Sequence, residues 1–281
     1  MFNSKLPKIF AHMSVLSQGN YVTNDYILSK NNNEISFLKR FCPHRMYPLH
    51  NVGDIVNEIA CDFHNYKWNK SGVPLNNHKS LKCGKAKAGK SGLIFSNFYE
   101  PNHKWVDDLA EEINLKYSHC FLGESKGSWL WLMDAEADYL HVYAKGIHPR
   151  LSSIIDVKDV KFDQGDNWIL QTHSKDWWSL YVYPYTFIEY KPGCLSVNTV
   201  TPKDVNCEFE FKWITQFYFD YDNTTLEDRV EFETLEAVFR EDVMAIEKIK
   251  GSYFPLMESD NILESHSVHF GKWYLKNVDK K

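Results

Sequence analysis

The sequence has little of what would assign its 281 residues to a membrane or nucleic-acid-binding class. No stretch approaches the roughly 20 consecutive apolar residues that a membrane-spanning helix needs. Residues 1–16 contain Lys5, Lys8 and His12 but no continuous apolar segment, so we expect no secretory signal. The formal net charge is −5 and there is no long basic run, which argues against a nucleic acid or an anionic membrane as partner.

Cysteine is also scarce, with six residues in the whole chain. That number is too small for a disulfide-stapled scaffold of this length, so we predict a reducing, cytoplasmic location. Cysteines in that environment bind metal or simply pack. The hydrophobic share of 43% supplies enough apolar material for one large domain or two modest ones.

The order of patterns along the chain predicts an α+β fold in two parts. Residues 34–66 alternate short apolar runs with turn residues, as strands do. Pro101-Asn102 marks a boundary, so we predict an all-β domain over residues 1–101 and a second domain over 102–281. In the second domain we expect antiparallel strands and a long C-terminal helix, together of the helix-grip type. The expected segments are a helix over 105–116, a strand passing into a helix over 127–148, strands within 177–190 and 208–221, and a helix over 224–250 capped by Thr224 or Thr225 and stopped at Gly251.

Two short loops in the first domain each carry one cysteine and one histidine. Cys42 and His44 form a Cys-x-His motif, and Cys61 and His64 form a Cys-x-x-His motif 16 residues later. Two thiolates suit one iron of a two-iron, two-sulfur cluster, and two imidazoles suit the other. A zinc site uses the same residue types, but zinc fingers usually pair cysteine with cysteine and histidine with histidine. The mixed loops therefore favour a Rieske cluster.

At these residues the chain resembles the Rieske non-haem iron oxygenases, the large subunits of ring-hydroxylating enzymes. Residues 42–49, Cys-Pro-His-Arg-Met-Tyr-Pro-Leu, are similar to the family's first cluster loop, and residues 61–72 are similar to its second. Met46 and Asn65 stand where glycine is usual, and Trp68 stands where phenylalanine is usual. Respiratory Rieske proteins add a disulfide cysteine to each loop. Phe63 occupies the second of those positions, so the chain resembles the oxygenase or ferredoxin branch.

A Rieske ferredoxin needs only about the first hundred residues, and some 180 more follow here, which leaves room for a second centre that receives the electron. Two histidines and one carboxylate commonly hold iron(II) with open positions for oxygen. Asp138, His141 and His148-Pro149 resemble the family's Asp-x-x-His-x-x-x-x-His pattern, with two extra residues between the histidines. Gly146 could absorb the extra length. The other possibilities are that both are ordinary surface histidines, or that His266 and His269, in an expected strand, serve instead.

The carboxylate ligand is expected in the long C-terminal helix. The resemblance selects Asp242, which shares an apolar stripe with Phe239, Val243 and Ile246 at helical spacing. A carboxylate on such a stripe needs a cation beside it. The alternatives are a ligand at Glu241 and a solvated acidic pair.

The resemblance implies the rest of the expected biochemistry. Electrons from NAD(P)H would pass through a flavin or iron–sulfur reductase, or a ferredoxin, to the cluster and then to the iron. With O2, the iron would hydroxylate, dealkylate or desaturate a small organic substrate. Asp138 would link the iron histidine to a cluster histidine of a neighbouring subunit, and the chain would assemble as a homotrimer.

The substrate is not fixed by sequence. The aromatic residues between Trp177 and Tyr190 could surround a quaternary ammonium, stack on an arene, or form the core of a sheet. The alternative function is an electron carrier whose C-terminal domain only docks a partner.

Overall fold

The computed structural model describes residues 9–96, 114–138, 141–143, 147–148, 160–174, 176–203, 208–261 and 264–277. The predicted domain boundary near residue 101 and most of the helix predicted over 105–116 lie outside this part of the chain. The end predicted for that helix is wrong, because Lys116 is the first residue of a long strand. No helix in the described part is long and apolar enough to cross a membrane.

The N-terminal part is built of strands, as predicted. Seven strands form one antiparallel sheet in the order β1-β9-β8-β4-β3-β2-β5, and β6 and β7 form a separate hairpin. A short 3-10 helix, η1 (Met13–Ser17), follows the first strand. The strands are β1 (Ile9–His12), β2 (Asn20–Val22), β3 (Tyr26–Asn31), β4 (Glu34–Lys39), β5 (Ile55–Val56), β6 (Ile59–Cys61), β7 (Tyr66–Trp68), β8 (Cys83–Ala88) and β9 (Leu93–Ser96).

A second antiparallel sheet of seven strands carries the rest of the molecule, in the order β10-β16-β15-β14-β13-β12-β11. The fold class predicted from the sequence, α+β with an all-β first part, is confirmed. The strands are β10 (Lys116–Ser128), β11 (Lys161–Gly165), β12 (Trp168–Thr172), β13 (Trp178–Val182), β14 (Thr186–Lys191), β15 (Cys194–Pro202) and β16 (Phe209–Phe219).

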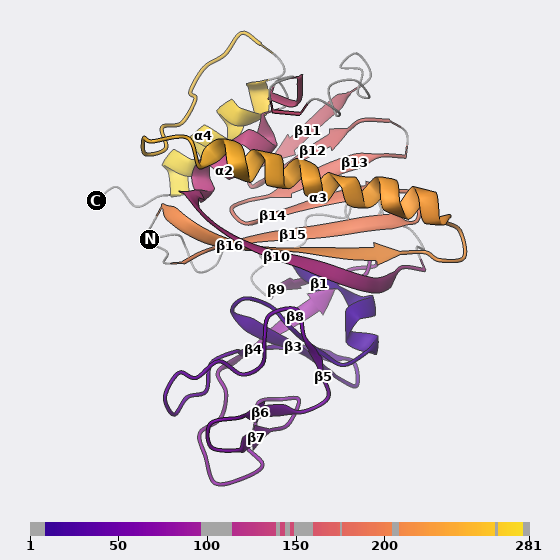
Figure 1. Cartoon of the computed structure of the whole chain (residues 1–281), viewed down its shortest axis with the longest axis vertical. Coiled ribbons are helices and arrows are strands. Elements are labelled where there is room, and N and C mark those ends of the chain that lie inside the picture. Colours follow the sequence, from indigo (N-terminus) through magenta and orange to yellow (C-terminus); the bar gives the residue numbers. More distant parts are fainter. Residues whose placement is uncertain are drawn as a thin grey trace.

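Among the described residues, three α-helices cover one face of the second sheet (Figure 1): α2 (Trp129–Ala137), α3 (Leu226–Ile246) and α4 (Ser265–Asn277). The predicted long helix is α3, which ends at Ile246 rather than at Lys250. Thr225 caps it in a capping box with Asp228, in which each side chain bonds the other residue's backbone N–H. His266 and His269 lie on α4, so the strand predicted for them is wrong.

The two faces of the second sheet have different neighbours. Residues whose side chains point one way, such as Leu180 and Val182, share a core with the N-terminal strands. Residues that point the other way, such as Tyr181 and Phe187, pack against the helices. Because successive side chains of a strand alternate between faces, one sheet joins both cores.

Candidate active site

The four predicted cluster residues come together at the tip of the N-terminal part. Cys42 and His44 follow β4, Cys61 ends β6, and His64 lies in the turn between β6 and β7. Both cysteines are 1% exposed, whereas both histidines are exposed. The Nδ1 atoms of His44 and His64 are 3.2 Å apart. Burial, and the neighbouring Cys61, raise the pKa of the Cys42 thiol, so its thiolate needs a cation close by.

Two departures from the family's loop sequence keep the backbone shape that glycine would give. Met46 has φ of 55° and Asn65 has φ of 56°, both in the left-handed region that glycine adopts most easily. Each closes a tight turn, because the Met46 N–H bonds the Cys42 carbonyl at 2.9 Å and the Asn65 N–H bonds the Cys61 carbonyl at 2.7 Å. The substitutions therefore preserve both loops.

The donor set fits a two-iron cluster. Within the described residues, one group offers three donor atoms within 4.8 Å of one another, and the cluster loops do not contribute to it. Their donors form a buried thiol pair and an exposed imidazole pair. Such an arrangement suits a [2Fe–2S] cluster with thiolates on the inner iron and imidazoles on the outer one.

The group with three close donors is the second predicted site, His141, His148 and Asp242. His141 begins the 3-10 turn η2 (His141–Tyr143), and Asp242 lies on α3. Oδ1 of Asp242 is 3.2 Å from Nε2 of His141 and 2.8 Å from Nε2 of His148. In both imidazoles, Nε2 is thus the nitrogen that faces this one carboxylate oxygen, although Asp242 lies far along the chain from both histidines.

The other nitrogen of each imidazole is held by a partner. Nδ1 of His141 donates to the backbone carbonyl of Asp138 in a short contact, and Nδ1 of His148 donates to Oε2 of Glu241 at 3.0 Å. These bonds place the free lone pair on Nε2 in both rings. Nε2 of His148 is buried, and its 2.8 Å contact with Asp242 does not have hydrogen-bond geometry. A metal ion would satisfy that nitrogen, and the donor set suits iron(II).

The charges at this site depend on one another. Burial opposes ionisation of Asp242, but His141 and His148 outweigh it and lower the pKa of the carboxyl group. Burial likewise opposes the charged imidazoles, and Asp242 outweighs it and raises the pKa of both histidines. The carboxylate is therefore ionised, and a bound metal ion would be its positive partner.

The structure separates the predicted candidates. Asp242 is 3% exposed with Phe239, Val243 and Ile246 buried around it, so the predicted apolar stripe on α3 is confirmed. Glu241, the alternative carboxylate, contacts His148 from the opposite side. His266 lies near Gln171 and is not part of the three-donor group. The main-chain oxygen of Asp138, and not its carboxylate, accepts the hydrogen bond from His141.

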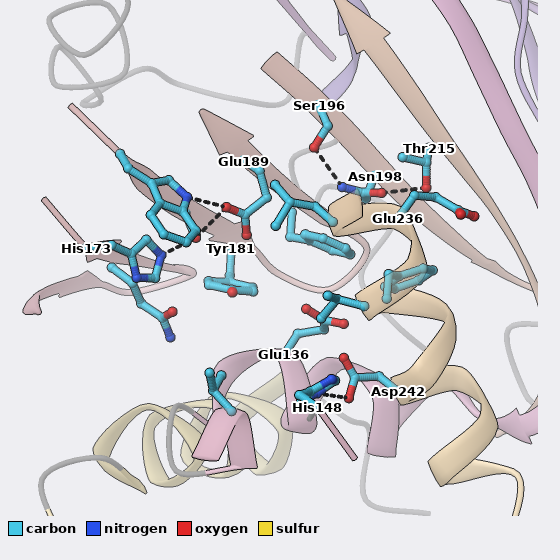
Figure 2. A pocket seen from close by; sticks show the side chains of 18 of the residues that line it. Glu136, His148, His173, Tyr181, Glu189, Ser196, Asn198, Thr215, Glu236 and Asp242 are labelled. Carbon is cyan, nitrogen blue, oxygen red and sulfur yellow. Dashed lines mark hydrogen bonds and ion pairs between the residues drawn. The ribbon is translucent and has the colours of Figure 1, made fainter. Parts of the chain in front are cut away.

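A pocket opens from these residues across the helix-facing side of the second sheet (Figure 2). The empty space there, with the open solvent at its mouth included, is about 660 Å³. The aromatic segment between Trp177 and Tyr190 divides: Trp177, Tyr181 and Phe187 line the pocket, while Trp178 lies in the opposite core.

Sequence reasoning missed several polar residues near the two sites. Glu136 and Glu189 line the pocket, and His173 meets Ser179 there at 2.6 Å. His78 stacks on Tyr66 at 3.7 Å, with its Nε2 3.9 Å from the Cys42 sulfur. The sequence offers one indication that Glu189 lines the pocket. It follows Phe187 by two residues on the same strand, so the two side chains point to the same face of the sheet.

Known proteins give a consistent comparison. The family model for the Rieske [2Fe-2S] domain matches residues 10–84. No curated protein matches the chain. Solved structures with the same fold include the quaternary ammonium Rieske monooxygenase CntA in complex with an inhibitor (19% identity, 97% of this chain, 88% of that chain, TM-score 0.74) and with its substrate L-carnitine (19%, 97%, 88%, 0.67). Pseudomonas putida CBB5 NdmA also matches (15%, 96%, 88%, TM-score 0.57).

The family match covers the segment that holds all four cluster residues, and the structural matches cover nearly the whole chain. The match confirms the Rieske interpretation of the mixed cysteine and histidine loops. Residues 10–84 thus match the Rieske [2Fe-2S] domain, and the chain as a whole shares its fold with the Rieske monooxygenase CntA and with NdmA.

Proposed function

We propose that this chain is the oxygenase component of a Rieske non-haem iron system. The observation that carries the proposal is the convergence of two Nε2 atoms and one carboxylate oxygen at a pocket wall. His141, His148 and Asp242 would hold iron(II), which supplies the site for O2 activation when bound. The chain's own contribution is to fix both imidazoles through Asp138 and Glu241, and to present a substrate to one open side.

Cys42, His44, Cys61 and His64 would bind the cluster that delivers electrons. The exposed imidazole edges of His44 and His64 face outward, where an electron can leave or enter. A reductase or ferredoxin fed by NAD(P)H would reduce the cluster. This electron-donor assignment rests on the resemblance of the cluster loops to those of the oxygenase branch.

Electron transfer would run between subunits. The β6–β7 hairpin lies at one end of the molecule, and α2, next to the predicted iron site, lies towards the other (Figure 1). A head-to-tail ring can bring one chain's cluster beside the next chain's iron, and a homotrimer closes such a ring. One CntA structure is described as giving insight into inter-subunit electron transfer. Asp138 would lie at the seam, beside His64 of the neighbouring chain.

The reaction would be hydroxylation, dealkylation or desaturation of a small arene or ammonium compound. CntA is named for quaternary ammonium compounds, and NdmA variants have been solved with theobromine and caffeine. The pocket beside Asp242 is lined by aromatic and polar side chains that can orient either class.

Iron content tests the proposal and separates it from a simple electron carrier. The oxygenase should hold about three irons per chain, two in the cluster and one mononuclear, whereas a carrier should hold about two. Asp242→Ala should lose the mononuclear iron and substrate-coupled oxygen uptake but keep the cluster spectrum. Glu227→Ala, an exposed change near the start of the same helix, is the matched control. Normal turnover by Asp242→Ala would refute the site.

A further inference from the structure

The pocket lining contains several acidic side chains. Four carboxylates line it, and no lysine or arginine does so among the residues that the structure describes. Asp242 is matched to the predicted iron. Glu236 is paired with Arg240, whose Nε lies 2.5 Å from its Oε1. Glu136 and Glu189 are left without a cationic partner inside the pocket.

Glu189 is held in place by neutral donors. It lies opposite Ser179 in the register of β13 and β14. Its Oε2 accepts a hydrogen bond from the Ser179 hydroxyl at 2.7 Å and from Nε1 of Trp177 at 3.3 Å. Lys191 lies over the Trp177 ring and bonds Glu231 at 3.0 Å, and it does not line the pocket. The carboxyl group is thus oriented and has no lysine or arginine beside it in the pocket, and burial raises its pKa to about 7.

Glu136 projects from α2 between the predicted iron site and the aromatic wall (Figure 2). Its Oε1 is buried and has no hydrogen-bond partner among the described residues. Burial raises the pKa of Glu136 well above its ordinary value, and the charges of Asp242 and Glu189 raise it further. A buried, unpartnered carboxyl group is costly unless a ligand supplies its partner.

Aromatic rings complete the surroundings of these two carboxyl groups. Tyr181 and Phe187 lie with their rings stacked, 6.0 Å between centroids, and Trp177 is bonded to Glu189. Ring faces and carboxylates both attract an organic cation, and the rings also provide contact for its methyl groups. A neutral arene would leave both carboxyl groups unmatched.

We propose that the pocket selects a small ammonium cation that carries no carboxylate of its own, held between Glu136 and Glu189. This inference rests on the proposed function and names the substrate class for the same site. It sets the chain apart from a protein whose substrates are L-carnitine and γ-butyrobetaine, because those zwitterions would bring a negative charge into an acidic pocket.

Calorimetric titration of the iron-loaded protein tests the proposal with ligands matched in shape. Choline is compared with 3,3-dimethylbutan-1-ol, its neutral isostere, and benzyltrimethylammonium with neopentylbenzene. The zwitterion γ-butyrobetaine is the third kind of ligand. At least one cation should bind about tenfold more tightly than its isostere and than the zwitterion, as one buried charge contact gives.

Glu189→Gln and Glu136→Gln keep the shape of each side chain and remove the acidic group that a bound cation would keep ionised. Each should reduce the preference for the cation over its isostere about tenfold, with cluster spectrum and iron content unchanged. Glu124→Gln, an exposed change on β10, controls for net charge. Equal binding of cation and isostere, tighter binding of the zwitterion, unchanged selectivity in both variants, or no binding of either cation would overturn the inference. Iron content is measured on the same samples, so loss of the proposed function would be seen separately.

Discussion

Nε2 of His148 lies 2.8 Å from Oδ1 of Asp242, while Nδ1 of the same ring bonds Glu241, the preceding residue of α3. Two successive residues of α3 therefore contact the two ring nitrogens of one histidine, Glu241 at Nδ1 and Asp242 at Nε2. Asp242 lies where a ligand would lie, and Glu241 acts as a positioning residue that fixes the ring and its tautomer.

Removing that positioning contact should weaken the iron site without destroying it. We expect Glu241→Ala to lower iron(II) affinity roughly 10–100-fold, as the loss of such orienting partners typically does. Competition with a chelator measures this, and the cluster spectrum should not change. Glu241→Gln can still accept the imidazole N–H and should recover part of the affinity. If Glu241→Ala abolished iron binding outright while Asp242→Ala did not, Glu241 would be the ligand.

Asp138 offers a test of the link between the two centres. Asp138→Asn keeps the backbone carbonyl that bonds His141, so both metals should remain bound. Loss of the side-chain charge should slow re-oxidation of the reduced cluster by about tenfold or more when substrate and oxygen are added. Stopped-flow absorbance in a single turnover gives the rate. An unchanged rate would mean that Asp138 only caps the C-terminal end of α2 and does not link the two centres.

Mixed assemblies test transfer between subunits. His64→Ala should lack the cluster and Asp242→Ala the mononuclear iron, so each variant alone should be inactive. In randomly mixed rings, roughly a quarter of the seams would join an intact cluster to an intact iron, and about that share of activity should return. The measurement is product formed per chain after co-expression. A mixture that stays inactive would mean that electrons pass within a chain.

The left-handed backbone at Met46 predicts an unusual substitution. Met46→Gly should raise the free energy of unfolding by up to about 1 kcal/mol, because glycine relieves the unfavourable φ at some cost in unfolded-chain entropy. The side chain is 67% exposed, so little packing is lost. Chemical denaturation and cluster content are the readouts. Met46→Ala, which keeps the strained φ, is the control and should show no gain.

Asp134 predicts a dependence of stability on pH. Burial raises the pKa of this carboxyl from 3.8 to about 7, and its contact with the Ser267 hydroxyl opposes that only partly. The folded chain then holds a proton that the unfolded chain has released, so stability should fall as pH rises from about 4 to 7 and level off above. The slope that Asp134 contributes is up to about 1.4 kcal/mol per pH unit.

The variant Asp134→Asn should remove that slope and should be more stable than the parent at pH 8. Differences in melting temperature between the two proteins at pH 5, 6, 7 and 8 isolate this residue from other buried carboxyls such as Glu189. Identical curves for variant and parent would show that Asp134 is ionised in the folded state.

Local patterns in the sequence predicted the features that depend on short spacings. The mixed loops at Cys42 and Cys61, and the stripe around Asp242, follow from motif and helical period. His141 and His148 come together with Asp242 despite the two extra residues between the histidines, as the resemblance implied.

Features that depend on contacts between distant segments were not predicted. The helix at Ser265–Asn277 was missed because Ser-His-Ser-Val-His alternates like a strand, and packing on α2 and on Tyr183 overrides that pattern. Glu136 and Glu189 are 53 residues apart, and no motif joins them. Only the packing of α2 on the sheet shows that both face one pocket.

The apolar core that the two sheets share limits which segments of this protein can be exchanged for those of a related protein. Phe10 and Tyr21 of the N-terminal part lie in one apolar cluster with Leu180 and Ile214 of the second sheet. A chimaera that exchanges the cluster-bearing half for that of another protein would have to bring a matching sheet surface with it. Swapping only the β6–β7 hairpin and the Cys42 loop leaves that cluster intact, so grafts of redox properties are best confined to those loops.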